Sequence, residues 1–393
     1  MTKSATSEPA KVGSHYSNEL SDIPVQTRSE RASSEDPESF GPVTGREAQW
    51  RLSPVAKLRP LIDGVLDGSS YAIEAPEVSG VTLSWPTPGE SGRGVAGMPE
   101  DRLSANAWSS VSDVAVVDIE GTHSQALHFS RSSLGSAARG AHMIIRVHPG
   151  AEAIFILTST GDALLGETVE FDVMEGAKLQ AVFVQDWNHG VIHYATHNAT
   201  VATGAVFTHI VVSLGGDVVI VNPTTQLVGA EAQGHLWGAY FADATQHLES
   251  RVYVHHQGPR TVSRVSYKGA LHGAGARTVW VGDVLIGADA IGTDSYEQNR
   301  NLVLSEGTRA DSIPNLEIKT GDIAGAGHAS ATGRFDDEQL FYLQSRGIEE
   351  LDARRLVVMG FLLDVVSHIS DPGLVKSLTE QIRNKLSLTE EDA

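Results

Sequence analysis

The sequence predicts a mainly β protein whose core is a parallel β-helix (solenoid), with helical regions before and after it. Short β-branched runs follow one another from about residue 117 to 323, and no long helical pattern interrupts them. Four turns with a glycine before a small residue, at Gly150, Gly176, Gly204 and Gly229, recur about every 26 residues. A period of that size indicates stacked coils. Two short strands and two turns would fill one coil, although an antiparallel sandwich leaves similar runs.

Composition divides the chain into four predicted parts. Residues 1–40 are rich in Ser, Glu and Pro, and such a segment buries too little apolar surface to offset its ordering entropy. We therefore expect a mobile polar tail there. Residues 41–117 form a mixed, partly helical region that Pro and Gly break into short elements. The β-helix core spans 118–333, and a C-terminal helical domain spans 334–393.

Three helices are expected after residue 334, each with local signals at its ends. Asp336–Glu338 place negative charge in the first turn of the first helix, and Gly347 is a suitable C-terminal cap. The second helix contains the run 356–363, which is apolar nearly all round and must be covered on more than one side. The third helix has Asp371 as N-cap and Pro372 at its first position.

Charge and composition exclude several classes of function. The chain has 29 Lys and Arg against 49 Asp and Glu, a net charge of −20, which disfavours binding to nucleic acid or to anionic lipid. No apolar run is long enough to span a membrane, and no secretory signal pattern is present, so we expect a cytoplasmic protein.

The chemistry that is absent is equally informative. The chain contains no cysteine, which excludes disulfides and a cluster held by this chain's own thiolates. No phosphate-binding glycine loop of the Gly-x4-Gly-Lys-(Ser/Thr) type and no Gly-x-Ser-x-Gly elbow occur. ATP chemistry and serine hydrolysis are therefore not expected in this chain.

A group of histidines suggests one functional alternative. His189, His193 and His197 are spaced by four, a spacing that puts side chains on one face of a strand or a helix. They could hold a first-row metal in a stand-alone metal-binding protein, or they could be surface or ladder histidines on one strand and turn. A second alternative is a carbohydrate-active β-helix enzyme, which needs carboxylates that converge on one face. The aspartates here are scattered.

The segment 324–348 carries a family resemblance. His328, Thr332 and Gly333, followed by an acidic turn and the run Phe341–Ile348, resemble the pattern of the SufB/SufD family of iron–sulfur cluster assembly proteins. Shorter segments that resemble the same family occur in the expected order at 45–54, 268–271, 301–306 and 314–318.

The resemblance implies a β-helix fold and a non-catalytic scaffold subunit of an iron–sulfur cluster assembly complex. Its partners would be a SufB-like subunit and a SufC-like ATPase. The cluster would be transient and present only in the complex, which could also hold a flavin, and the chain alone could form a homodimer. Ala326 stands where a cysteine often precedes the histidine, and Ala329 replaces the usual glycine after it. The missing thiol favours the SufD branch.

Two sets of site residues follow from the resemblance. His328 is expected at the interface with the SufB-like subunit, as a metal ligand shared with a partner that supplies the thiolate. The C-terminal helices are expected to dock the ATPase subunit through Leu356, Phe361, Leu374 and Leu378.

Overall fold

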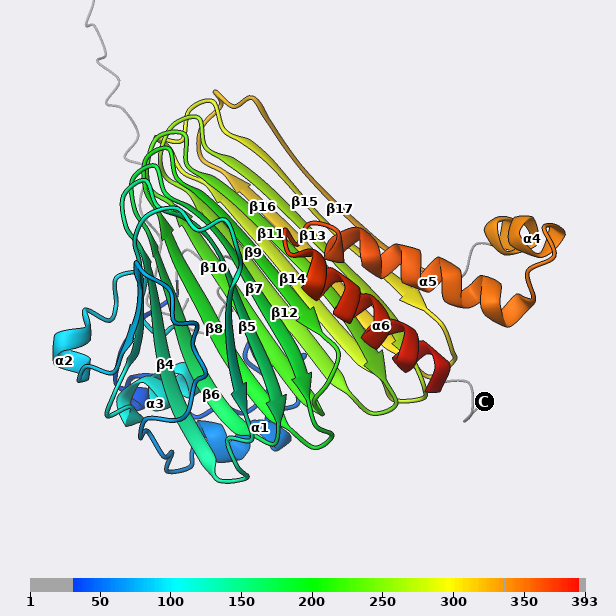
Figure 1. Ribbon diagram of the computed structural model, residues 1–393, viewed down its shortest axis with the longest axis horizontal. Helices are drawn as coiled ribbons and strands as arrows, with labels where there is room; N and C mark the ends of the chain where they lie inside the picture. Colours follow the sequence, from blue (N-terminus) through cyan, green and yellow to red (C-terminus); the bar gives the residue numbers. More distant parts are fainter. Residues whose placement is uncertain (1–30, 335–336, 389–393) are drawn as a thin grey trace, which may run out of the picture.

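The computed structural model describes residues 31–334 and 337–388, and most of this chain forms a parallel β-solenoid (Figure 1). In the described residues the strands make two long sheets, and successive strands alternate between them. The predicted fold class is confirmed. The boundaries predicted at 40, 117 and 333 remain predictions, and residues 1–30 of the predicted tail lie outside the described residues.

The two sheets have the following order. The nine-stranded sheet contains β1 (Val81–Ser84), β2 (Ala115–Ile119), β4 (Ala138–Val147), β6 (Leu164–Val173), β8 (Ile192–Val201), β10 (Val218–Leu227), β12 (His247–His256), β14 (Arg277–Ile286) and β16 (Arg309–Ile318). The eight-stranded sheet contains β3 (Leu127–Ser132), β5 (Glu152–Gly161), β7 (Lys178–Trp187), β9 (Val206–Ser213), β11 (Gln233–Asp243), β13 (Val262–His272), β15 (Asp294–Val303) and β17 (Gly325–Gly333).

The helices lie before the solenoid, in its first connections, and after its last strand. They are the short 3-10 helix η3 (Pro37–Ser39), α1 (Val55–Ile62), α2 (Pro88–Ser91), α3 (Arg102–Ser110), α4 (Asp337–Ser345), α5 (Glu350–Val366) and α6 (Pro372–Leu388). At the start of α6 the Asp371 side chain accepts a hydrogen bond from the Leu374 amide at 2.6 Å, as its N-cap position predicts.

Turn glycines stack from coil to coil. Gly150, Gly176 and Gly204 have φ angles of 71°, 66° and 64°, which a residue without a Cβ adopts at little cost. Each of their amides donates to a carbonyl of the next coil, as from Gly176 to Thr203 at 3.0 Å. The next coil places Glu231, with φ 61°, at the left-handed turn position that Gly229 was expected to occupy. The period in the sequence therefore reflects a real stack, although its fourth member is not a glycine.

Phenylalanine rings pack against one another in the interior between the sheets along the first coils. Phe129 and Phe155 lie 4.8 Å apart between ring centroids, and Phe171 lies 5.0 Å from Phe207. Aromatic pairs at these separations add to the burial of their large apolar surfaces. This packing holds the two sheets together along the first half of the solenoid.

A buried ion-pair network sits in the same interior. Both terminal nitrogens of Arg131 contact Glu167, at 2.6 and 2.7 Å, and His193 Nε2 lies 2.6 Å from the same carboxyl. Burial alone would raise the pKa of Glu167, but the charge and hydrogen bonds of Arg131 hold it well below its ordinary value. Replacing one member of such a network would leave an uncompensated buried charge. The network therefore constrains which residues can occupy these three positions.

Helices cover the outer faces of both sheets. Leu58, Leu61 and Leu103 of α1 and α3 pack with Val218 and Ile220 on the nine-stranded sheet. On the other side of the molecule α5 and α6 run side by side along the eight-stranded sheet, whereas α4 projects away from it (Figure 1).

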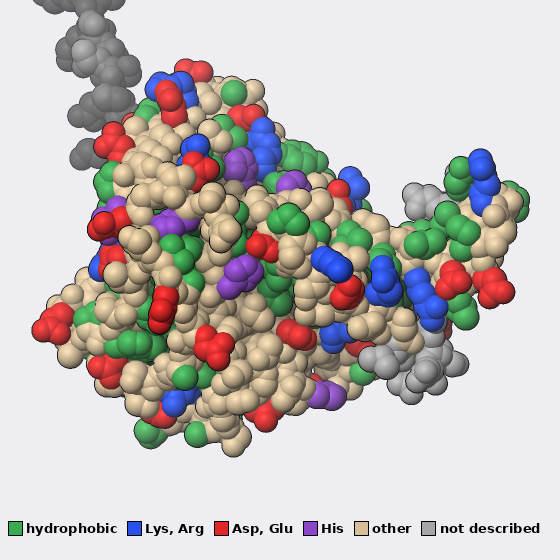
Figure 2. Space-filling view, in the orientation of Figure 1, with side chains coloured by type: hydrophobic (Ala, Val, Ile, Leu, Met, Phe, Trp, Pro, Cys, Tyr) green, Lys and Arg blue, Asp and Glu red, His purple; other side chains and the backbone are tan. Residues whose placement is uncertain are grey.

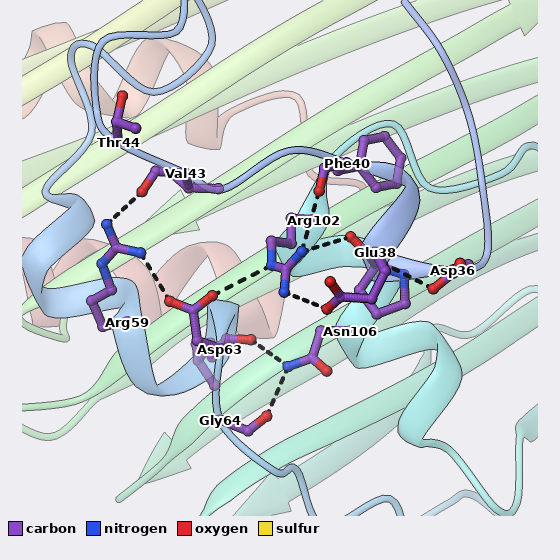
Figure 3. Close-up of polar contacts among 12 residues, drawn as sticks. Asp36, Glu38, Phe40, Val43, Thr44, Arg59, Asp63, Gly64, Arg102 and Asn106 are labelled. Carbon is purple, nitrogen blue, oxygen red and sulfur yellow. Dashed lines mark hydrogen bonds and ion pairs between the residues drawn. The ribbon is translucent and has the colours of Figure 1, made fainter.

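Arginine side chains fasten the first helical region (Figure 3). Arg102 donates to the carbonyl oxygens of Pro37 and Phe40 and pairs with Glu38 at 2.5 Å. Its Nε also lies 3.4 Å from Asp63, at the end of α1. One α3 side chain thus holds both the chain before α1 and the end of α1 against the solenoid.

Buried histidines make stability depend on pH. Burial lowers the pKa of His209 and of His256 from 6.5 to about 3. Their contribution to folding is complete above pH 6.5 and is lost as the pH falls toward 3, because the unfolded chain then binds more protons. Glu297 on β15 acts in the opposite direction, since its pKa is raised from 4.5 to about 8.

We expect the free energy of unfolding to fall as the pH is lowered from 7 to 4. Each of the two histidines contributes a slope of up to about 1.4 kcal/mol per pH unit, and one carboxyl cannot cancel both. Chemical unfolding at a series of pH values measures this slope. A free energy that stays constant or rises over this range would contradict the assignment of neutral, buried imidazoles.

Candidate functional site

The two ends of the solenoid are built differently. At the first end β1 pairs antiparallel with β2, and Glu74 bridges to Ser130 on β3. At the last end β16 and β17 each pair with only one strand of their sheet, within the described part of the chain. Every side chain of β17 is half-buried or exposed, unlike those of the central strands. We call the end formed by β16 and β17 the open end.

His328 lies in the middle of β17, at this open end. It pairs in register with Glu297 on β15, so both side chains point to the same side of the sheet. The His328 side chain is 43% exposed, and its Nδ1 lies 3.8 Å from Glu297 Oε1. The structure therefore places the predicted ligand at an accessible edge with one carboxyl beneath it.

Glu297 is an unusual neighbour because it is buried and lacks a close hydrogen-bond partner in the described residues. Its side chain is 1% exposed, and neither carboxyl oxygen has a hydrogen-bond partner in the described residues. Burial and then the charge of Asp283 raise its pKa to about 8, against a smaller effect of the Asn315 backbone amide. An unsatisfied buried group of this kind costs about 1–3 kcal/mol.

The interior near the open end is polar. Asn299 donates to the hydroxyl of Tyr240 at 2.8 Å, and that hydroxyl donates to Asn301 at 2.9 Å. Asn301 in turn donates to Asn299 at 2.7 Å and approaches Thr332 of β17 at 3.4 Å. Phenylalanines fill the first coils, whereas the last coils contain amides and one carboxyl beside apolar residues such as Trp280 and Ile286.

Sequence reasoning missed Glu297. A signal was present, because Ser295, Glu297, Asn299 and Asn301 alternate along one strand. In a solenoid strand every second residue faces the interior, so four polar residues in that register mark an interior that is not a hydrophobic core.

The three histidines spaced by four do not come together as a metal site. His189 is exposed in the turn before β8, whereas His193 and His197 are fully buried on β8. His193 contacts Glu167, and His197 Nδ1 lies 2.9 Å from His209 Nε2. Among the residues described, no group of three or more His, Cys, Asp or Glu could hold a metal ion.

The predicted docking residues differ in accessibility. Leu356 is 50% exposed, and Phe361 and Leu374 are half-buried. Leu378 is fully buried among α5, α6 and the eight-stranded sheet, so it supports the helices from inside. Their role in docking stays a prediction.

An apolar surface extends from α5 to the projecting α4. Phe341 is 72% exposed, Tyr342 57% and Leu351 55%, and together with Leu356 they form what we call the C-terminal apolar surface. Apolar side chains are visible on the outlying α4 in Figure 2. Beside it, Lys268 of β13 pairs with Asp364 at 2.7 Å and lies over the ring of Phe361. Exposed apolar area of this kind marks a contact surface.

Fold and site together define a two-sheeted parallel β-solenoid protein with one sheet edge, and a histidine on it, open to another molecule. None of the helices in the described ranges is long and apolar enough to cross a membrane.

Comparison with known proteins gives the family. The family described as "SUF system FeS cluster assembly, SufBD core domain" matches residues 129–361. The chain is 43% identical over 377 residues to an iron–sulfur cluster assembly SufBD family protein of Mycobacterium tuberculosis, with 93% of this chain and 95% of that protein covered. A Mycobacterium leprae protein of the same description is 44% identical over 367 residues, 90% of this chain and 93% of that protein.

The chain belongs to the SufBD family of iron–sulfur cluster assembly proteins. A second M. tuberculosis protein with this description is 29% identical over 208 residues, which covers 53% of this chain and 24% of that protein. The resemblance seen in the sequence is confirmed at the level of the family.

Proposed function

We propose that this chain is a scaffold subunit of the SufD kind, which pairs with a SufB-like subunit through its open end and docks a SufC-like ATPase through its C-terminal helices. The observation that carries the proposal is a half-exposed histidine on an unpaired edge strand in a chain that has no cysteine. An unpaired edge is a template for another strand.

The chemistry of the donors supports a site shared between two chains. The iron–sulfur cluster is the cargo of the assembly, and its iron atoms are bound by thiolates or by imidazole. This chain offers the imidazole of His328 but no thiolate. A thiolate from the facing subunit would complete the set, so the scaffold role needs no catalysis by this chain.

The relatives agree with a pair of unlike subunits. M. tuberculosis has one SufBD family protein that matches nearly the whole of this chain and another that matches half of it at lower identity. Two such members in one organism are what a heterologous pair requires. The open end also suits such a pair. The first end of the solenoid is covered by β1, so an added strand would pair more readily at the open end.

The C-terminal apolar surface is the proposed docking site for the ATPase. It lies partly on α5, which packs against the outer face of the eight-stranded sheet, and partly on α4, which projects from that sheet. A flavin in the complex, a homodimer of the chain alone and a cytoplasmic location remain predictions from the sequence.

The first prediction concerns His328. His328→Ala should leave the complex assembled, because the side chain makes no close hydrogen bond and is 43% exposed. Cluster transfer to an acceptor protein by the reconstituted complex should fall at least about tenfold. Loss of a residue that only supports a metal ligand typically costs about 10–100-fold, and loss of the ligand itself should cost no less.

His189→Ala is the matched control, because His189 is exposed and lies in a turn far along the chain from β17. His193 is unsuitable, since it is buried and contacts Glu167. Normal transfer by His328→Ala, with the complex intact, would show that the imidazole is not used.

A second prediction separates docking from folding in the C-terminal helices. Leu356→Asp should weaken binding of the ATPase subunit without lowering thermal stability, because the side chain is 50% exposed. Leu378→Asp should lower stability by about 3–5 kcal/mol, because it buries a charge in a fully buried position. Calorimetry of binding and of unfolding measures both. ATPase binding that is unchanged in Leu356→Asp would place the docking surface elsewhere.

A further inference from the structure

Glu297 has features that no structural role explains. It is a buried carboxyl without a hydrogen-bond partner in the described residues, whereas other buried carboxyls of the protein are paired, Glu167 with Arg131 in the interior and Glu249 with Arg251 on the outer face of the nine-stranded sheet. The imidazole of His328 lies 3.8 Å from it on the neighbouring strand of the open end. A buried carboxyl without a hydrogen-bond partner lowers stability, and a bound ligand would offset that cost.

The opposite sheet leaves room for this carboxyl. Gly282 on β14 faces it, and a Cβ at that position would lie 2.3 Å from the Trp280 ring and 2.4 Å from Glu297 Oε2. Any larger residue would have to displace the ring and the carboxyl or shift the strand. The absence of a side chain at Gly282 thus creates a small cradle in which Glu297 points into the interior just below β17.

The distance between the two donors fits a shared cation better than a hydrogen bond. Glu297 Oε1 and His328 Nδ1 are 3.8 Å apart, beyond hydrogen-bonding range. A first-row divalent cation binds a carboxylate oxygen or an imidazole nitrogen at about 2.0–2.2 Å, so both donors can reach one ion. The His328 side chain is 43% exposed, so an ion can reach its imidazole from the solvent.

We propose that Glu297 and His328 together form this chain's half of a divalent iron site at the open end. The inference rests on the proposed function, which it extends by naming a second ligand. Two protein donors leave positions for water or for the partner's groups, so binding by the chain alone is expected to be weak but measurable.

Co(II), as a spectroscopic stand-in, and anaerobic Fe(II) are the probes for the full-length chain. Titration should show about one ion per chain, with affinity at least about tenfold lower in Glu297→Gln and in His328→Ala. The double variant should be scarcely weaker than either single variant, because both residues act on the same ion. His189→Ala should bind as the unchanged chain does.

Stability provides an independent readout. Glu297→Gln keeps the side-chain volume and replaces a carboxyl that has no hydrogen-bond partner in the described residues, so thermal stability should not fall. A structural role would predict a clear loss instead, and such a loss would overturn the proposal.

The outcomes also separate this inference from the proposed function. If Glu297→Gln binds Co(II) normally while His328→Ala does not, or if the unchanged chain binds no Co(II) or Fe(II) at millimolar concentration, the half-site is wrong. The scaffold role could still hold, because cluster transfer by the His328→Ala complex tests it separately.

Discussion

A stack of parallel coils has to end somewhere, and each end leaves a row of backbone donors and acceptors without partners. This constraint shapes the whole molecule. At the first end the chain turns back, and β1 covers β2 in antiparallel pairing. At the last end β16 and β17 are left with one neighbour each, among the residues that the structure describes. An end built in this way suits a scaffold whose partner supplies the missing strands.

The side chains of the interior also change from the first end of the solenoid to the open end. The first coils contain packed phenylalanines and the Arg131–Glu167 network, and the last coils contain amides and the carboxyl of Glu297. Hydrophobic packing therefore holds the solenoid where it is closed, and polar groups accumulate where it is open. His328, the proposed ligand, lies at this open end and is 43% exposed, so water, ions or a partner can reach it.

Sequence patterns predicted those features that depend on local geometry. The turn glycines, the N-cap Asp371 and the capping Gly347 (φ 83°) each satisfy a requirement of one turn of backbone, so they are visible without the fold. The turn position of Glu231 was not predicted, because a non-glycine residue can adopt a left-handed conformation when the surrounding stack holds it there. The burial of Leu378 could not be predicted for a related reason. Helical periodicity identifies an apolar face but does not show which surface covers it. The alternation of Ser295, Glu297, Asn299 and Asn301 indicates a polar interior, but only the fold shows that Glu297 is buried and lies beside His328.

The central claim is that the open end is the surface that meets the SufB-like subunit, and amide hydrogen exchange of the chain with and without that subunit tests it most directly. The account predicts that amides of β17, residues 325–333, exchange more slowly in the complex, while those of β1 at the closed end are unchanged. Equal exchange of β17 in both states, or slower exchange at β1 instead, would contradict it.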